Sequence, residues 1–332
     1  MTIYGIGIFQ PDDDPLIGAF AQWLNPAPYT TTDAGSGGFT LCALWTRIFS
    51  PSGIRSWVEV GYTQGFGGQN VTALYWAEGI SGVYYEYVVG EPVGPPGTQH
   101  AYQAKVVGDE WTVVVDGETW GWSPQPPLGT EINVGGEMTS ANNVLTATNP
   151  AEMSFQTRNG WQPWTAQPDA ISRGQEDPLT FQWIQLGVLG QAASGGAVEV
   201  KDAPRVDAGL PEGRPATGPG ASGGPFLARS EAEAIARVAA AATGDSQARL
   251  VALETTTHGD AVAARRAGRS STVADDREVY VARFEGTFTF RRGPRGTPPR
   301  RASALEVEID ATDGRVLALG SRAIEESGPV AE

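Results

Sequence analysis

Short strand-like segments recur through the first half of this chain, and glycine, proline, asparagine or aspartate residues separate most of them. All ten tryptophans lie before residue 184, in the same part of the chain. Short strands at nearly regular spacing, with turn residues between them, are typical of an antiparallel β-sandwich or jelly roll. The sequence therefore predicts a mainly β first half, with an edge strand at 2–9 and further strands at 39–49, 56–62, 71–76, 83–89, 100–107, 110–115, 131–138 and 152–157.

The second half of the chain differs in composition, and this difference divides the molecule into parts. Residues 189–224 are mainly glycine, alanine, proline and serine, which supply no hydrophobic core and are typical of a linker. We therefore predict a β-sandwich at 1–188, a linker at 189–224, a small α+β domain at 225–323 and a tail at 324–332.

The predicted α+β domain begins with an alanine-rich helix. Ser230 is a suitable N-cap for this helix, and Glu233 completes a capping box. Ile235, Val238 and Ala242 share one stripe, which we expect to face the core. Strands are predicted after the helix at 249–254, 278–290 and 304–309.

The charge is strongly acidic and unevenly distributed. The formal net charge is −15, and residues 1–190 contribute −13 of it, from 5 basic and 18 acidic side chains. An acidic surface repels phosphate backbones, so we expect no nucleic-acid partner. A basic cluster near the end of the chain is the local exception, and we interpret it as a solvated loop that contains Arg291, Arg292, Arg295, Arg300 and Arg301.

Several kinds of site and location have no support in the sequence. Cys42 is the only cysteine, so an intrachain disulfide and a zinc site with several cysteines are both excluded. The two histidines are far apart in the sequence, and no nucleotide-binding motif is present, so we expect no metal and no cofactor. No apolar run is long enough for a membrane span, and we see no signal peptide.

A series of short motifs in the first half resembles a known family. The motifs are Trp57-Val-Glu-Val-Gly-Tyr62, Tyr84-Tyr-Glu-Tyr87, His100-Ala-Tyr102, Trp111…Val115-Asp-Gly117 and Gly135-Gly-Glu137. Their order resembles concanavalin A-like jelly rolls and, more narrowly, the bacterial relatives of the glutamic peptidase and neprosin group. The resemblance covers roughly residues 39–165. It implies a two-sheet antiparallel sandwich with a concave face.

The same resemblance implies candidate catalytic residues on that face. In the peptidases of the group, a glutamate paired with a glutamine or a second glutamate activates water. The glutamate corresponds to Glu137, with Glu152 as a competing match, and its partner corresponds to Glu59 or Gln64. One carboxylate would act as a general base and its partner would stabilise the oxyanion. Because two close carboxylates raise one pKa, such an enzyme would work best in acid.

The aromatic residues suggest a different role for the sandwich. Flat rings on a sheet stack on sugar rings, and nearby polar side chains bind hydroxyl groups. The candidate ligand-binding residues are Trp57, Tyr85, Tyr87, Trp111, Trp120 and Trp122. The alternative is that most of these rings form the sandwich core. We expect Trp120 and Trp122 to be the most exposed pair, because they follow a predicted hairpin turn at Asp116-Gly117.

The end of the chain contains the most specific local match. The segment Leu305-Glu-Val-Glu-Ile-Asp-Ala-Thr-Asp-Gly-Arg-Val-Leu317 resembles the last hairpin of PepSY-like domains, with the turn at Asp310–Gly314. The match covers 226–320, and an insertion at 257–277 departs from the compact pattern. It implies an extracellular or cell-envelope location. Such domains sometimes restrain a peptidase, and a plain accessory module is the alternative.

Three functions remain open from the sequence. The first is a non-catalytic surface or secreted protein that binds a glycan or another extended polymer, which includes polypeptide. The second is an acid-active glutamic peptidase-like enzyme that uses Glu137 with Glu59 or Gln64. The third is a structural subunit that self-assembles.

Overall fold

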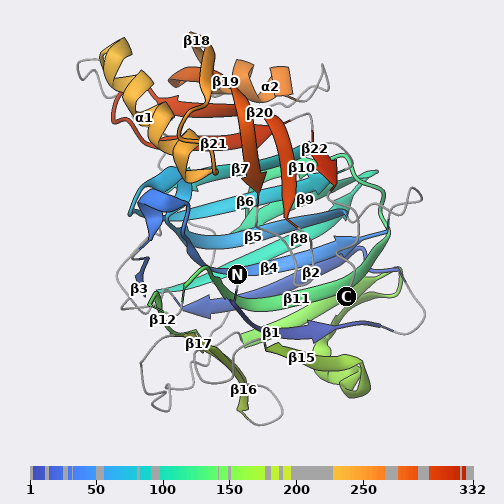
Figure 1. The fold of residues 1–332 in the computed structure, drawn as a ribbon. Coiled ribbons are helices and arrows are strands. Elements are labelled where there is room, and N and C mark those ends of the chain that lie inside the picture. The colour runs from blue at the N-terminus through green and yellow to red at the C-terminus, as the bar shows by residue number, and fades with distance from the viewer. Residues whose placement is uncertain are drawn as a thin grey trace.

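The protein is mainly β, with antiparallel sheets (Figure 1). A computed structural model describes residues 3–11, 15–24, 29–31, 33–49, 56–80, 83–90, 98–140, 142–148, 151–175, 181–186, 190–195, 227–265, 276–290, 299–321 and 324–326. We call the described residues 3–175 the sandwich and the described residues 227–326 the C-terminal module. The predicted linker and tail lie mostly outside the described residues.

Within the described residues, the largest sheet has 12 strands. Its order is β15 (Ile171–Gln175), β1 (Ile3–Phe9), β11 (Gly129–Met138), β4 (Thr40–Ile48), β5 (Ser56–Gln64), β6 (Thr72–Ile80), β7 (Val83–Gly90), β21 (Val316–Ser321), β20 (Arg300–Asp310), β19 (Glu278–Phe290) and β18 (Arg249–Thr257). Strand β22 (Ile324–Glu326) also pairs with β20.

Two smaller sheets complete the described β-structure. A six-stranded sheet has the order β10 (Glu118–Ser123), β9 (Glu110–Val115), β8 (Gln99–Val107), β2 (Gly18–Leu24), β13 (Ala151–Thr157) and β14 (Gly160–Pro163). A four-stranded sheet has the order β16 (Phe181–Leu186), β17 (Gly190–Gly195), β12 (Val144–Thr148) and β3 (Tyr29–Thr30). Short 3-10 helices lie at η1 (Ala34–Ser36), η2 (Phe66–Gly68), η3 (Trp164–Ala166) and η4 (Pro168–Ala170).

The sandwich core lies between the large sheet and the six-stranded sheet. Alternate residues of each strand point into this space, as the two-residue period of a β-strand requires. Rings from the two sheets meet there: Trp23 of β2 meets Tyr62 of β5 edge-on, with ring centroids 6.5 Å apart. Within the six-stranded sheet, Trp23 also stacks on Tyr102 of β8, with centroids 4.0 Å apart. Burial raises the pKa of Tyr102, and nearby Cys42 and Asp116 raise it further. This layer of aromatic and aliphatic side chains holds the two sheets together.

The strands predicted for the first half are confirmed, but one was misplaced in its sheet and several others were not predicted, among them β12, β14 and β15. Strand β1 is not an edge strand, because it pairs with β11 on one side and β15 on the other. Strand β2 was not predicted, although it lies in the middle of the six-stranded sheet. The hairpin between β9 and β10 turns at Asp116 and Gly117, with φ values of 52° and 84°, as the Asp-Gly pair predicted.

The helix of the C-terminal module differs in detail from the prediction. Helix α1 spans Arg229–Ala242, so Ser230 lies inside the helix and is not its N-cap. The side chain of Glu231, not Glu233, accepts a hydrogen bond from the backbone N–H of Ala228. The predicted apolar stripe is also wrong, because Val238 is 48% exposed. The buried positions of α1 are alanines, whose small side chains let the helix approach the sheet closely: Ala232, Ala236, Ala239 and Ala240.

The C-terminal module and the sandwich share one sheet. The turn predicted at Asp310–Gly314 joins β20 to β21, and β21 pairs with β7 of the sandwich over four residue pairs, from Ala318 opposite Tyr87 to Ser321 opposite Tyr84. A second helix, α2 (His258–Arg265), follows β18 within the predicted insertion. No helix among the described residues is long and apolar enough to cross a membrane.

Candidate functional site

The C-terminal module covers one face of the large sheet at β5 and β7. We call it the covered face and define it by alternate residues of β1, β4, β5, β6, β7 and β11, which are Tyr4, Trp45, Trp57, Glu59, Tyr75, Tyr84, Glu86 and Glu137. All of these side chains are buried. Its apolar members form one cluster with side chains of α1, β19 and β20.

The hairpin formed by β19 and β20 makes direct contacts with the covered face. Figure 1 shows these two strands reaching down over β7 and β6. The guanidinium of Arg300 lies over the ring of Trp57, 4.2 Å from its centroid. The ring of Phe290 packs on Tyr84 with centroids 4.7 Å apart. Arg300 was expected in a solvated loop, but it is 3% exposed, because the hairpin places it against the sandwich.

The register of the sheet separates the two carboxylates that the family resemblance would pair. Glu137 is opposite Leu41 on β4, whereas Glu59 is opposite Trp45, four residues further along that strand. Two strand spacings and four residues correspond to roughly 16 Å between their Cα atoms. Glu59 instead accepts a hydrogen bond from the hydroxyl of Tyr75. The described structure therefore does not bring Glu59 and Glu137 together as a pair.

The other two candidate catalytic residues lie on different surfaces. Gln64 is five residues after Glu59 on β5, so its side chain points to the opposite face of the sheet from Glu59. Glu152 is exposed on β13 of the six-stranded sheet and has a φ of 51°. Neither residue shares a face with Glu137.

Most of the predicted ligand-binding rings are buried. Tyr85, Tyr87 and Trp111 belong to the core between the sheets, and Tyr87 stacks on Trp76 with centroids 4.4 Å apart. Trp57 is fully buried on the covered face. In this structure a soluble ligand has no direct access to these four rings. Their surroundings fit the alternative interpretation from the sequence, in which most of these rings form a structural core.

The other face of the six-stranded sheet carries an ordered row of side chains, which we call the outer row. Consecutive members are directly opposite one another on neighbouring strands, in the order Trp161, Gln156, Gly18, Lys105, Thr112 and Trp122. The row faces away from the core, because Ala19, the residue after Gly18, points into it. Five strand spacings separate the two tryptophans, which corresponds to roughly 24 Å between their Cα atoms.

Trp161 is held in place at one end of the outer row. It is 41% exposed. A side chain at Gly18 would come within 2.9 Å of Trp161 Cη2, so the indole lies close above this glycine. Phe20 meets Trp161 edge-on, with ring centroids 6.5 Å apart. The ring is therefore both accessible and oriented before any ligand binds.

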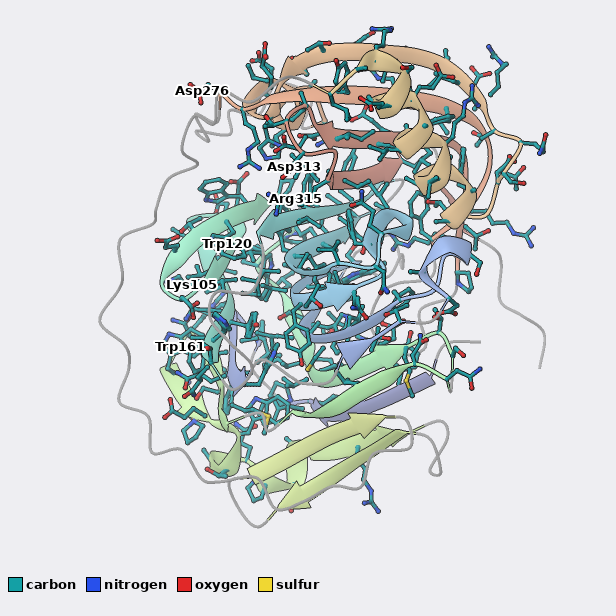
Figure 2. All side chains as sticks on the ribbon, turned by 90° about the vertical axis from the view of Figure 1, so that its left-hand side faces the viewer. Lys105, Trp120, Trp161, Asp276, Asp313 and Arg315 are labelled. Atoms are coloured by element: carbon teal, nitrogen blue, oxygen red, sulfur yellow. The ribbon has the colours of Figure 1, made fainter. Side chains whose placement is uncertain are left out.

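The two rings that were expected to be most exposed lie at the far end of the row, where Trp122 is a member of the row and Trp120 is its neighbour on β10. Trp120 and Trp122 are both half-buried. Trp120 lies at an irregularity between β10 and β9 and packs partly against the core. Figure 2 shows Trp120, Lys105 and Trp161 along the same side of the molecule. The outer row thus joins the ring of Trp122 to Gln156, Lys105 and Thr112, which the sequence did not single out as a site.

The C-terminal module holds a separate cluster of ionisable groups. Arg265 of α2 forms ion pairs with Glu308 and with Glu306, whose Oε1 lies 2.6 Å from the Arg265 Nε. His258 Nδ1 also contacts Glu308. Burial opposes the charge of Glu308, but Arg265 and the hydrogen bond from His258 outweigh it, so its pKa is lowered. Burial alone would lower the pKa of Arg265, whereas Glu308 and Glu306 raise it, with a net increase.

The chain matches no protein-family model. A search of curated proteins also finds no match. Among solved structures, it is similar to scytalido-glutamic peptidase with a transition state analog inhibitor, at 12% identity and a TM-score of 0.38, over 58% of this chain and 98% of that chain. A native glycosidic hydrolase is 12% identical, with a TM-score of 0.25, over 57% of this chain and 74% of that one.

A third similar structure is the kappa-carrageenase from Pseudoalteromonas carrageenovora in complex with an oligotetrasaccharide of kappa-carrageenan. It is 11% identical, with a TM-score of 0.26, over 56% of this chain and 67% of that one. The assignment of a function to this chain therefore depends on its own residues.

Proposed function

We propose that the protein is a non-catalytic binding protein that holds an extended glycan along the outer row. The observation that carries the proposal is the register that places Trp161 and Trp122 at the two ends of one row. Aromatic rings at both ends offer stacking surfaces for sugar rings, and polar groups between them offer hydrogen bonds to hydroxyl groups.

The length and shape of the outer row favour a polymer over a small molecule. A row roughly 24 Å long fits several consecutive sugar units. Gly18 lies between Gln156 and Lys105, and its lack of a side chain lets the Gln156 and Trp161 side chains lie over it. Lys105 supplies a positive charge on an otherwise acidic sandwich, which favours a glycan that carries hydroxyl or acidic groups.

The register supports binding over the peptidase alternative, because Glu59 and Glu137 are too far apart to share a proton or a water molecule. We retain an extracellular or cell-envelope location and a PepSY-like identity for the C-terminal module as parts of the proposal. Self-assembly remains a prediction, which light scattering without added ligand would test.

Replacing Trp161 with alanine is expected to weaken glycan binding by about tenfold, because the exposed stacking surface is lost. Affinity electrophoresis of the full chain through gels that contain a neutral or an acidic polysaccharide would measure this effect. Phe49→Ala is the matched control, since Phe49 is 52% exposed but lies outside the outer row. If a polysaccharide gel retards Trp161→Ala and the unmodified chain equally, the assignment of the glycan site to this row is disproved. If no polysaccharide retards the unmodified chain, glycan binding itself is disproved.

A further inference from the structure

Three side chains of the outer row border one glycine. The side chains of Gln156 on β13 and Trp161 on β14 both lie over Gly18, because a Cβ at Gly18 would be 2.7 Å from the Gln156 Oε1 and 2.9 Å from the Trp161 Cη2. Lys105 is directly opposite Gly18 on β8, the strand on the other side. Figure 2 shows Lys105 and Trp161 on the same side of the molecule. An indole ring, an amide and an ammonium group therefore lie around the same place in the row.

Lys105 brings a positive charge to this place that no carboxylate of the described residues neutralises. The residue is half-buried and takes part in no ion pair with them. No member of the outer row is acidic. In the register of the sheet the closest carboxylate on this face belongs to Glu110, whose Cα is roughly 8 Å from that of Lys105. A cation among neutral groups is suited to a ligand that carries an acidic group.

The next residue of the row, Thr112, has a hydroxyl group without a partner. Thr112 is 4% exposed, and within the part of the chain that the structure describes its Oγ1 makes no hydrogen bond. Leaving a buried hydroxyl unpaired is costly, and a hydroxyl can donate to a ligand oxygen as well as accept. Because Thr112 is directly opposite Lys105, an acidic oxygen bound by the lysine is one strand spacing from this donor.

A second cation lies close to the same end of the row. Arg158 is exposed, follows Gln156 by two residues, and forms no ion pair with the rest of the described chain. Two strand spacings and two residues separate Arg158 from Lys105, which corresponds to roughly 12 Å between their Cα atoms. Residues 1–190 contain only 5 basic side chains, so two of the five are near this end of the row. A polymer with acidic groups at regular intervals can contact both.

The acidity of the remaining sandwich is compatible with an acidic ligand at this place. Residues 1–190 carry 18 acidic side chains, which repel an anion at long range. Salt limits this repulsion, because exposed charges interact over only about 8 Å at physiological ionic strength. A ligand on the outer row therefore responds mainly to Lys105 and Arg158. The acidic background then restricts an anionic ligand to the place where these two cations compensate its charge.

We infer that the glycan of the outer row is acidic, and that one of its sugar units stacks on Trp161 while the carboxylate or sulfate group of that unit binds Lys105. The amide of Gln156 and the hydroxyl of Thr112 supply hydrogen bonds on either side of the lysine. A neutral glycan uses the ring but leaves the charge of Lys105 without a counter-charge. This inference rests on the proposed binding of a glycan to the row and adds the chemical class of that glycan.

Sets of polymers that share a backbone test this inference on the full chain by affinity electrophoresis. Hydroxyethyl cellulose is neutral, carboxymethyl cellulose carries carboxylates and cellulose sulfate carries sulfate groups. Dextran with dextran sulfate, and polygalacturonate with its methyl ester, extend the comparison to other backbones. At least one acidic polymer is expected to bind about tenfold more tightly than its neutral counterpart. Each mobility is divided by that of the same variant in a gel without polymer.

Lys105→Met is expected to weaken binding of that acidic polymer about tenfold and to change binding of the neutral polymer less than about twofold. Arg173→Met is the matched control, since it removes one positive charge from an exposed residue of β15 in the large sheet. Glu110→Gln is expected to act in the opposite direction and to strengthen binding of the acidic polymer about two- to threefold, because it removes the nearest negative charge on this face.

The outcomes separate this inference from the proposed function. If acidic and neutral polymers retard the chain equally, and Trp161→Ala reduces both effects, the row binds glycans but the acidic class is wrong. If the preference for acidic polymers persists in Lys105→Met, the acidic group binds elsewhere and the inference is overturned. If no polymer retards the unmodified chain, glycan binding and the inference fail together.

Discussion

Replacing Arg265 with methionine is expected to lower the free energy of unfolding of the C-terminal module by about 3–5 kcal/mol. The side chain of Arg265 is 2% exposed and neutralises Glu308, whose side chain has no exposed surface. Without the guanidinium, Glu308 keeps His258 as a partner, but its buried negative charge is no longer fully compensated. Removing one member of a buried ion pair costs more than the pair contributes, because the remaining charge stays in a region of low polarity.

Urea unfolding followed by circular dichroism would measure this loss as a lower midpoint. Arg283→Met is the matched control, because the Arg283 side chain pairs with Glu254 and Glu306 but is 46% exposed. Exposed ion pairs contribute about 0–1 kcal/mol, so the control is expected to change the midpoint little. Similar effects of the two substitutions would contradict the special role of the buried pair.

The same ion pair determines the direction in which the stability of the C-terminal module changes with pH. The pKa of Glu308 is lowered in the folded protein. The folded protein therefore stabilises the ionised carboxylate of Glu308 more than the unfolded chain does. The resulting stability is present above the ordinary pKa of a glutamate and is lost as the pH falls through the lowered folded value. In Arg265→Met this acid-induced loss is expected to shrink, because the main cause of the lowered pKa is absent. Unfolding midpoints measured from neutral to acidic pH would show the difference.

The strands of the sandwich could be predicted because local signals suffice for them. Turn residues mark strand ends, and Asp116-Gly117 fixes one hairpin by backbone conformation alone. Strand β2 was missed because its inward side chains include the small residues Ala19 and Ala21, which give a weak apolar signal beside Trp23. The alternation of Ala19, Ala21 and Trp23 with other residues was the signal that could have identified it.

The sites could not be predicted, because they depend on register between strands that are distant in sequence. Trp161 and Trp122 are 39 positions apart in the chain, and only the pairings of six strands place them in one row. The contact of Arg300 with Trp57 on the covered face joins residues that are still further apart in the sequence. The two-residue period of a strand puts Trp57 and Glu59 on one face, but it carries no information about what packs on that face.

Replacing Gly320 with valine is expected to separate the C-terminal module from the sandwich at the β21–β7 junction. Gly320 is directly opposite Tyr85, and a Cβ at this position would lie 1.9 Å from the ring atom Cδ1 and 3.0 Å from the carbonyl oxygen of Tyr84. Tyr85 cannot move away easily, because it is 3% exposed and packed in the core between the sheets. Overpacking of this kind costs about 1–3 kcal/mol.

Hydrogen exchange would locate the effect, because the alternate backbone amides of β7 that bond to β21 rather than to β6 are protected only while the junction is closed. A loss of about 1–3 kcal/mol corresponds to about 5- to 150-fold faster exchange at Tyr84–Tyr87. Ser303→Ala is the matched control, since Ser303 is exposed on β20 and away from the junction. Unchanged exchange at these amides in Gly320→Val would show that the junction stays closed and would contradict the expected overpacking.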